Sequence, residues 1–304
     1  MPDLTNGLWA IEYLEPQLLE DFRNYRDDFI GTLRAPNPAA IGQDGILFNK
    51  LVNNVDFKIN YGSQFTPAAM TGKKGLVEWD KMDTTPTLCT DAELRGMAFD
   101  KEAAIRQEHT NSFKIGVRDY VLDKLAPYEA APGMLVMRTT GATIGTRKRL
   151  TYADLLNFYN QLTKLNLNDS AGWCMVLSDD HRTDLMVDRS NTNNYRDLEF
   201  DPSTGEVKRF FKLRLFENND TPYYNNADKK LSLGATPTST DQKASVFFYA
   251  PNTVYHIESV KVLYKPMQQD TRNADPQSEF RLHTYGLCDN KQKHGFGALV
   301  SANA

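Results

Sequence analysis

The sequence predicts an α+β protein in which elongated segments precede the compact part of the chain. Three observations lead to this fold class. A long run of helical periodicity, from about residue 98 to residue 125, lies between β-rich segments instead of alternating with them. The second half of the chain consists mainly of short strand patterns. An apolar N-terminal segment and a long hairpin come before any segment that is typical of a core.

The composition excludes several classes of protein. The 304 residues carry a formal net charge of −4 and are 40% hydrophobic and 11% aromatic, as expected of a folded chain without a strongly basic surface. Cys89, Cys174 and Cys288 are far apart, so we expect neither a disulfide framework nor a zinc site. No apolar run is long enough to span a bilayer, and the N-terminus lacks the pattern of a signal peptide. We therefore expect a chain that is made inside the cell and does not contact a membrane.

Residues 1–50 are predicted to form an arm. Apolar residues with partly helical spacing are interrupted by Pro16, and "RAPNPAAIGQDG" then ends any regular element. An apolar segment of this kind packs either on its own domain or on a neighbouring subunit. Trp9, Leu14 and Phe22 are the arm residues that we expect at an interface.

Residues 51–92 are predicted to form an extended loop, which is a long β-hairpin from Val52 to Thr90. Two strand patterns flank the polar, glycine-containing stretch "SQFTPAAMTGKKG". Lys73 and Lys74 are expected to be exposed near its tip, as interface candidates. A hairpin with no helix beside it is only marginally stable, so this one is expected to need a partner.

Residues 93–188 are predicted to contain the long helix, followed by a strand, a helix, a strand and a helix. The long helix covers about 28 residues, or about 40 Å at 1.5 Å per residue. Thr151, with Asp154 three residues later, is a helix N-cap, and Ser178 is the next one. The apolar side chains of the long helix form one stripe: Ile105, Phe113, Val117, Val121 and Leu125. Residues 189–265 are β-rich, and residues 266–304 end in two strands.

The stretch "GWCMVLSDDHRTDLM" allows a catalytic and a structural interpretation. Asp179, Asp180 and His181 are suitable acid–base groups, but adjacent side chains at a helix start diverge by about 100° each. We favour helix capping and pairing with the helix dipole. Ser178 lacks the glycines of a GxSxG nucleophile turn, and no histidine has metal-binding spacing. No cofactor or metal is expected.

The turn "GATIGTRKR" carries Arg147, Lys148 and Arg149. Its two glycines do not have the spacing of a phosphate-binding loop. Two interpretations remain open. The turn is a solvated basic cluster, or these three residues pair with acidic groups of a neighbouring subunit.

The order of these elements resembles that of tailed-phage major capsid proteins, which share the HK-ninety-seven fold. Three stretches carry the resemblance: the helix after "PTLCTDAEL", the stretch "LTYADLLNFYNQLTKLNLNDSAGWCMVLSDDHRTDLM", and the ending "EFRLHTYGLCDNKQKHGFGALV". The resemblance implies an arm (1–50), an extended loop (51–92) and a peripheral domain with a spine helix (93–188). It further implies an axial domain (189–265) and a return to the peripheral domain (266–304).

The resemblance also implies a function without catalysis. Many copies assemble in the host cytoplasm, as hexamers and pentamers, into the icosahedral shell of a virion, which encloses DNA without recognising it specifically. A portal and decoration proteins are further implied partners. A separate scaffolding protein is expected because the sequence has no long charged helical N-terminal region. Some relatives crosslink a lysine of the extended loop to an asparagine, but we find no carboxylate base for Lys73 or Lys74 in the sequence.

Two alternatives remain at this point. An encapsulin-like cellular compartment uses the same fold and would hold cargo peptides. An intracellular hydrolase using Asp180 and His181 would be a lone enzyme with an acidic cleft. Sedimentation and negative-stain microscopy of the expressed chain distinguish a shell protein from such an enzyme.

Overall fold

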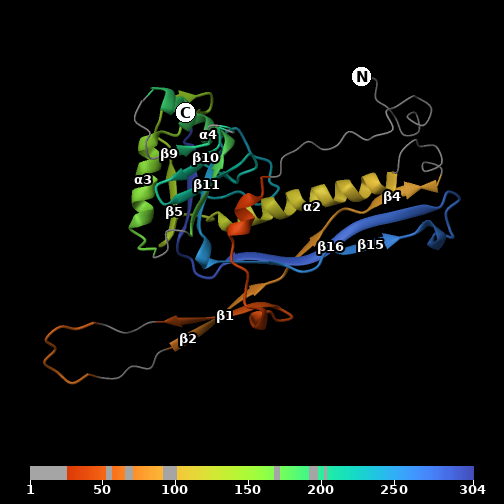
Figure 1. The fold of residues 1–304 in the computed structure, drawn as a ribbon, viewed down its shortest axis with the longest axis horizontal. Coiled ribbons are helices and arrows are strands. Elements are labelled where there is room, and N and C mark those ends of the chain that lie inside the picture. Colours follow the sequence, from red (N-terminus) through yellow and green to blue (C-terminus); the bar gives the residue numbers. More distant parts are fainter. Residues whose placement is uncertain are drawn as a thin grey trace.

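The computed structural model contains a compact lobe, a long extension and a projecting hairpin (Figure 1). The extension is built on helix α2 (Lys101–Leu125), and the hairpin is formed by strands β1 (Gly45–Val52) and β2 (Thr71–Glu78). The predicted arm residues Trp9, Leu14 and Phe22 lie outside the described residues. The structure describes residues 26–52, 57–65, 71–91, 101–167, 172–191, 198–201, 203 and 205–304.

The lobe is a mixed sheet covered on both faces. Helices α3 (Tyr152–Thr163) and α4 (Asp179–Asn191) cover one face, while α2 and the 3-10 helix η2 (Asp28–Thr32) pack on the other. All six residues of β8 are therefore buried. In spatial order the strands are β5 (Met134–Arg138), β17 (Phe296–Val300), β13 (Gln242–Tyr249), β8 (Trp173–Ser178), β11 (Leu213–Asn218), β10 (Val207–Phe210) and β9 (Leu198–Phe200), and β12 (Tyr223–Tyr224) pairs with β13.

The extension is a narrow sheet under α2. Its central strand β16 is 14 residues long and alternates between buried and less buried positions, so one face of the strand packs toward the helix. Phe280 of β16 contacts the ring of His109 on α2, with ring centroids 5.0 Å apart. The strands are β3 (Asp80–Asp83), β4 (Thr87–Thr90), β14 (Thr253–Ile257), β15 (Lys261–Lys265) and β16 (Gln277–Asn290). Short 3-10 helices lie at Pro38–Ala40 (η3), Ala250–Asn252 (η4) and Met267–Gln269 (η5).

The hairpin begins earlier than the sequence predicted. Its register runs from Gly45 opposite Glu78 to Val52 opposite Thr71, so the first strand starts inside the segment assigned to the arm. Residues 87–90 were assigned to the hairpin but form β4 and pair with β16 instead. Gly45 has φ 149°, and a Cβ there would lie 2.0 Å from the Val77 carbonyl oxygen, so the base of the hairpin requires glycine.

The predicted domain boundaries also differ from the grouping of the strands. The segment 93–188 was assigned to one domain, yet α2 lies along the extension whereas β8, α3 and α4 belong to the lobe. Conversely β14 and β15 were assigned to the axial domain (189–265), but they pair with β16 of the extension. Strand β17 returns to the lobe, where it pairs with β13. The chain therefore crosses between the two sheets more often than the predicted domain boundaries imply, because strands that are distant in sequence pair with one another.

The sequence correctly predicted where α2 ends and which residue caps the start of α3. Helix α2 ends at Leu125, and Val117, Val121 and Leu125 of the predicted stripe are buried. Thr151 caps α3, accepting a hydrogen bond from the Asp154 backbone N–H in a capping box. Pattern and caps are local properties, which is why the sequence alone could place them.

Phe29 fastens η2 to the lobe and provides a test of this packing. The side chain is fully buried and meets Phe248 edge-on, with centroids 6.4 Å apart. Phe29→Ala is expected to lower the free energy of unfolding by about 3 kcal/mol or more, because it leaves a cavity. Denaturant unfolding measures the change, and exposed Asp28→Ala should stay within about 0.5 kcal/mol of wild type. Equal stability of the two variants would show that η2 is not docked.

Candidate assembly surfaces

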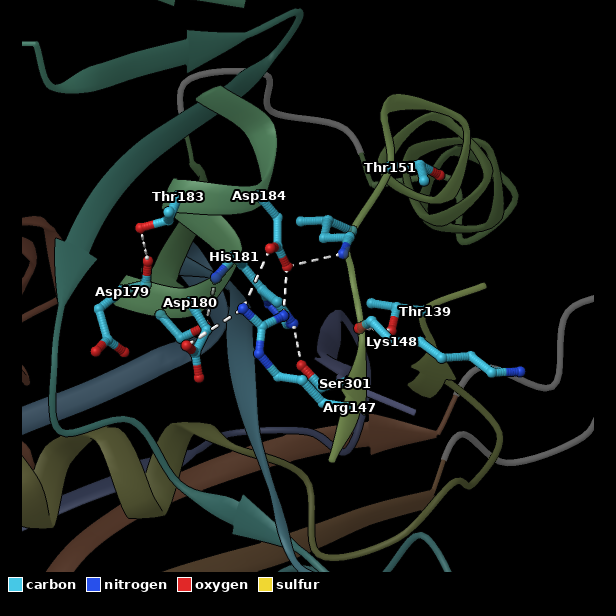
Figure 2. A network of polar contacts seen from close by, with 12 residues as sticks. Thr139, Arg147, Lys148, Thr151, Asp179, Asp180, His181, Thr183, Asp184 and Ser301 are labelled. Atoms are coloured by element: carbon cyan, nitrogen blue, oxygen red, sulfur yellow. Dashed lines mark hydrogen bonds and ion pairs between the residues drawn. The ribbon is translucent and has the colours of Figure 1, made fainter. Parts of the chain in front are cut away.

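The start of α4 is a polar network in which every group has a structural partner (Figure 2). Ser178 caps the helix by accepting the backbone N–H of His181 at 3.3 Å. Asp179 pairs with Lys243 at 2.9 Å, and Asp180 pairs with Arg147 at 3.3 Å. The three residues suspected of acid–base chemistry therefore point to different partners and do not converge on a substrate position.

His181 has a structural role, as the favoured interpretation of this stretch expected, but the sequence did not predict that it is fully buried. Its Nδ1 lies 2.7 Å from the Ser245 hydroxyl and its Nε2 lies 2.9 Å from the Ser301 hydroxyl, so the ring connects α4 to β13 and to the segment after β17. Burial lowers the pKa of His181 to about 4, which keeps the ring neutral. No local signal in the sequence marks the two serines as its partners.

The basic turn does not act as one cluster. Arg147, in the short strand β7 (Arg147–Lys148) opposite β6 (Thr143–Ile144), binds Asp184 through Nη1 at 2.5 Å and Nη2 at 3.1 Å. Asp184 is almost fully buried and also accepts the Leu150 backbone N–H at 2.9 Å. Arg147 is thus engaged within its own chain, and its role at an interface stays a prediction. Lys148 extends away from this network (Figure 2), and it remains an interface candidate together with Arg149.

The hairpin presents apolar side chains to solvent. Phe57, Ile59 and Phe65 at its tip are 90%, 75% and 65% exposed, and Leu47 and Leu76 on the strands are also exposed. Side chains of this size are usually buried, and contiguous apolar exposure marks interaction sites. Lys73 lies opposite Lys50, and Lys74 lies opposite Asn49, so both predicted lysines are in the paired part of β2 and not at the tip.

The root of the hairpin is tied to the long helix. At the start of β3, Asp80 accepts a hydrogen bond from the Tyr120 hydroxyl and pairs with Lys124 at 3.0 Å. The Tyr120 hydroxyl in turn accepts the Cys288 backbone N–H at 3.2 Å. Burial, together with Asp80, raises the pKa of Tyr120, so its hydroxyl stays a donor. The direction of the hairpin is therefore set by α2 and β16.

Within the described residues, no three histidine, cysteine, aspartate or glutamate side chains are placed to hold a metal ion. Across the same part of the chain, no helix combines the length and the apolar character that crossing a membrane requires. The three cysteines are free and buried.

The fold was compared with known proteins. No family model matches the sequence, and no curated protein resembles it in sequence. Solved structures do resemble it. The capsid of cyanophage P-SCSP1u has a TM-score of 0.67 at 13% identity, with 97% of this chain and 93% of that chain covered. The cyanophage Pam1 capsid asymmetric unit has a TM-score of 0.65 at 11% identity, covering 99% and 100%. A Mycobacterium phage Che8 structure has a TM-score of 0.63 at 14% identity, covering 95% and 96%.

These similarities extend over nearly the whole chain and define its fold. The chain has the α+β fold of tailed-phage capsid proteins, as the order of its sequence elements predicted. The identities of 11–14% are too low to transfer individual residues, so the assembly surfaces rest on this chain's own geometry.

Arg147 tests whether the α4 network stabilises the lobe. Arg147→Ala leaves the buried Asp184 carboxylate without its cation and is expected to lower the free energy of unfolding by about 3–5 kcal/mol. Lys148→Ala removes the neighbouring cation and should change the stability by less than about 0.5 kcal/mol. Urea unfolding of both variants gives the comparison, and equal losses would contradict the network.

The burial of His181 as a neutral ring predicts that the protein loses stability in acid. Its pKa is lowered on folding, so unfolding takes up a proton and the stability falls as the pH decreases from about 6.5 to about 4. The full loss is about 3 kcal/mol at 1.36 kcal/mol per pKa unit. Unfolding free energies of wild type and His181→Gln, measured across this range, should converge as the pH falls. Parallel curves would mean that His181 does not titrate on unfolding.

Proposed function

We propose that this chain is the major capsid protein of a tailed phage. One observation carries the proposal: the chain matches phage capsid structures over nearly its full length. The exposed apolar tip of the hairpin is consistent with it. Neighbouring copies would cover these tips, and many copies together would enclose the viral DNA in an icosahedral shell.

The mechanism is mechanical and needs no catalytic residue. Each contact involves different surfaces on the two copies, and such head-to-tail contacts close into rings when the rotation fits. Hexamers and pentamers are the expected rings, with the lobe as the axial domain and the α2 extension as the peripheral domain. A subunit that touches several neighbours leaves the shell only when several contacts break together.

Further partners follow from the same proposal. A separate scaffolding protein would guide the assembly of the shell, and a portal and decoration proteins would be further partners. The packaged DNA would be enclosed without specific recognition, because the net charge of −4 gives no general attraction for phosphate. Assembly would take place in the host cytoplasm and the product would be the virion.

The expressed chain tests the proposal directly. Sedimentation velocity and negative-stain microscopy should detect rings or closed shells that grow with protein concentration. A compact monomer at every concentration, with or without a co-expressed scaffold, would overturn the proposal.

Shortening the hairpin separates folding from assembly. Val52 pairs with Thr71, so an Asn-Gly turn replacing residues 53–70 closes the ladder without strain. This variant should keep the wild-type melting temperature within a few degrees, because the lobe core is untouched, and it should form no shells. Shells of normal size from the shortened chain would contradict a role of the tip in assembly.

A further inference from the structure

A cavity of about 220 Å³ lies where the C-terminal half of α2 meets the lobe. Helix α2 contributes Asp119 and Asp123, which are four residues apart and therefore share one face of the helix. Residues 219–223, the loop 231–235 and Lys243 of β13 form the rest of the wall. The cavity is thus separate from the hairpin and from the basic turn.

Two carboxylates at this cavity share one guanidinium group. The buried Arg118 side chain donates to Asp119 Oδ1 from Nε at 2.9 Å and from Nη2 at 2.7 Å, and its Nη2 also donates to Asp220. Burial raises the pKa of Asp119, and the nearby charge of Asp220 adds to this effect, although Arg118 acts in the opposite direction. Two carboxylates on a single guanidinium leave one negative charge without compensation.

The other charged groups of the wall have partners of their own. Asp123 pairs with Lys230 at 2.9 Å. Lys243 pairs with Asp179 at 2.9 Å and donates to the Asn219 carbonyl at 2.9 Å. Both lysines are largely buried in these contacts, so neither neutralises the shared pair. Among the described residues, the charged groups of the wall and their direct partners are therefore four carboxylates and three cations.

Thr221 is a second and independent indication of a ligand. This residue lines the cavity and is only 2% exposed, and its hydroxyl has no hydrogen-bond partner among the described residues. Buried hydroxyl groups are normally hydrogen-bonded, because losing their hydration without a replacement is unfavourable. Thr221 follows Asp220 in the chain, so one polar group of a ligand can meet both. A ligand with hydrogen-bond donors would supply the missing partner.

The rest of the wall is apolar and already formed. Its apolar residues are Pro222, Tyr223, Leu231, Leu233 and Ala235. The Leu231 backbone N–H donates to the Tyr223 carbonyl at 2.9 Å, and the Ala235 N–H donates to the Ser232 carbonyl at 3.0 Å, so the loop is fixed by its own hydrogen bonds. Leu233 is 54% exposed, which places apolar surface at the mouth of the cavity. A wall formed in advance lowers the entropic cost of binding.

These properties together favour one ligand chemistry. A phosphate or carboxylate group would add to the negative excess. A divalent metal ion prefers several oxygen ligands, and within the described residues no three suitable side chains converge. A primary ammonium group brings one positive charge and three hydrogen-bond donors. An alkyl chain attached to it can cover apolar side chains, as the stem of a lysine does.

We propose that this cavity binds a primary alkylammonium group, with the ammonium between the Asp220 carboxylate and the Thr221 hydroxyl and the alkyl chain along Leu231 and Leu233. A free diamine and the side chain of a lysine share this chemistry, and the first experiment below distinguishes them. The site lies within a single copy of the chain, so the proposal does not depend on assembly into a shell.

Calorimetric titration of the full chain tests whether the ligand needs its charge. n-Butylamine should bind at least about tenfold more tightly than 1-butanol, which has the same chain length without the charge. 1,4-Diaminobutane and Nα-acetyl-lysine amide distinguish the two sources. Tighter binding of the diamine assigns the site to free diamines, and equal or tighter binding of the lysine derivative assigns it to a lysine side chain. Equal affinities for n-butylamine and 1-butanol, or no binding of any amine, would overturn the proposal.

Two variants test the groups that hold the ammonium. Asp220→Asn and Thr221→Val should each weaken the binding of n-butylamine at least about fivefold. Without a ligand, Thr221→Val should keep or raise the melting temperature, because it removes a buried hydroxyl that has no partner. The affinity and the melting temperature therefore respond differently, which a purely structural role of Thr221 does not predict.

Asp28→Asn is the matched control. It also removes one exposed carboxylate, but Asp28 lies outside the cavity, so this variant should bind n-butylamine like wild type. If Asp220→Asn and Thr221→Val bind the amine as tightly as this control does, the amine binds elsewhere and the proposal is wrong.

Discussion

The antiparallel ladder between β1 and β2 is the constraint on which the rest of the structure depends. Its eight residue pairs start at Gly45, where a side chain would collide with the Val77 carbonyl, and they hold the tip beyond the reach of the chain's own core. Leaving a large apolar side chain in water forgoes about 1.5–3 kcal/mol relative to burying it. Burying Phe57, Ile59 and Phe65 would therefore favour association with another molecule, whereas the isolated chain leaves them exposed. A flexible loop would collapse onto the nearest surface, whereas a paired ladder cannot.

The ladder holds the tip in a fixed direction because the root of the hairpin is attached to α2. Asp80 is fixed by Tyr120 and Lys124 on α2, and the same helix contributes Val121 and Leu125 to the lobe core. One helix thus couples the direction of the hairpin to the packing of the sheet. The buried polar groups of the lobe likewise connect elements that are distant in sequence. Buried His181 and the Arg147–Asp184 pair hold elements of the lobe together, and their side chains are engaged with partners in the same chain.

Local patterns in the sequence predicted much of this fold, and pairings over long sequence distances account for what they missed. The stripe on α2, the caps Thr151 and Ser178, and the existence of a hairpin follow from neighbouring residues alone. The predicted segments differ from the grouping of the strands, because β16 pairs with four separate strands and β17 returns to the lobe, which no local pattern encodes. Arg147 looked like a surface cation because its partner Asp184 lies 37 positions away.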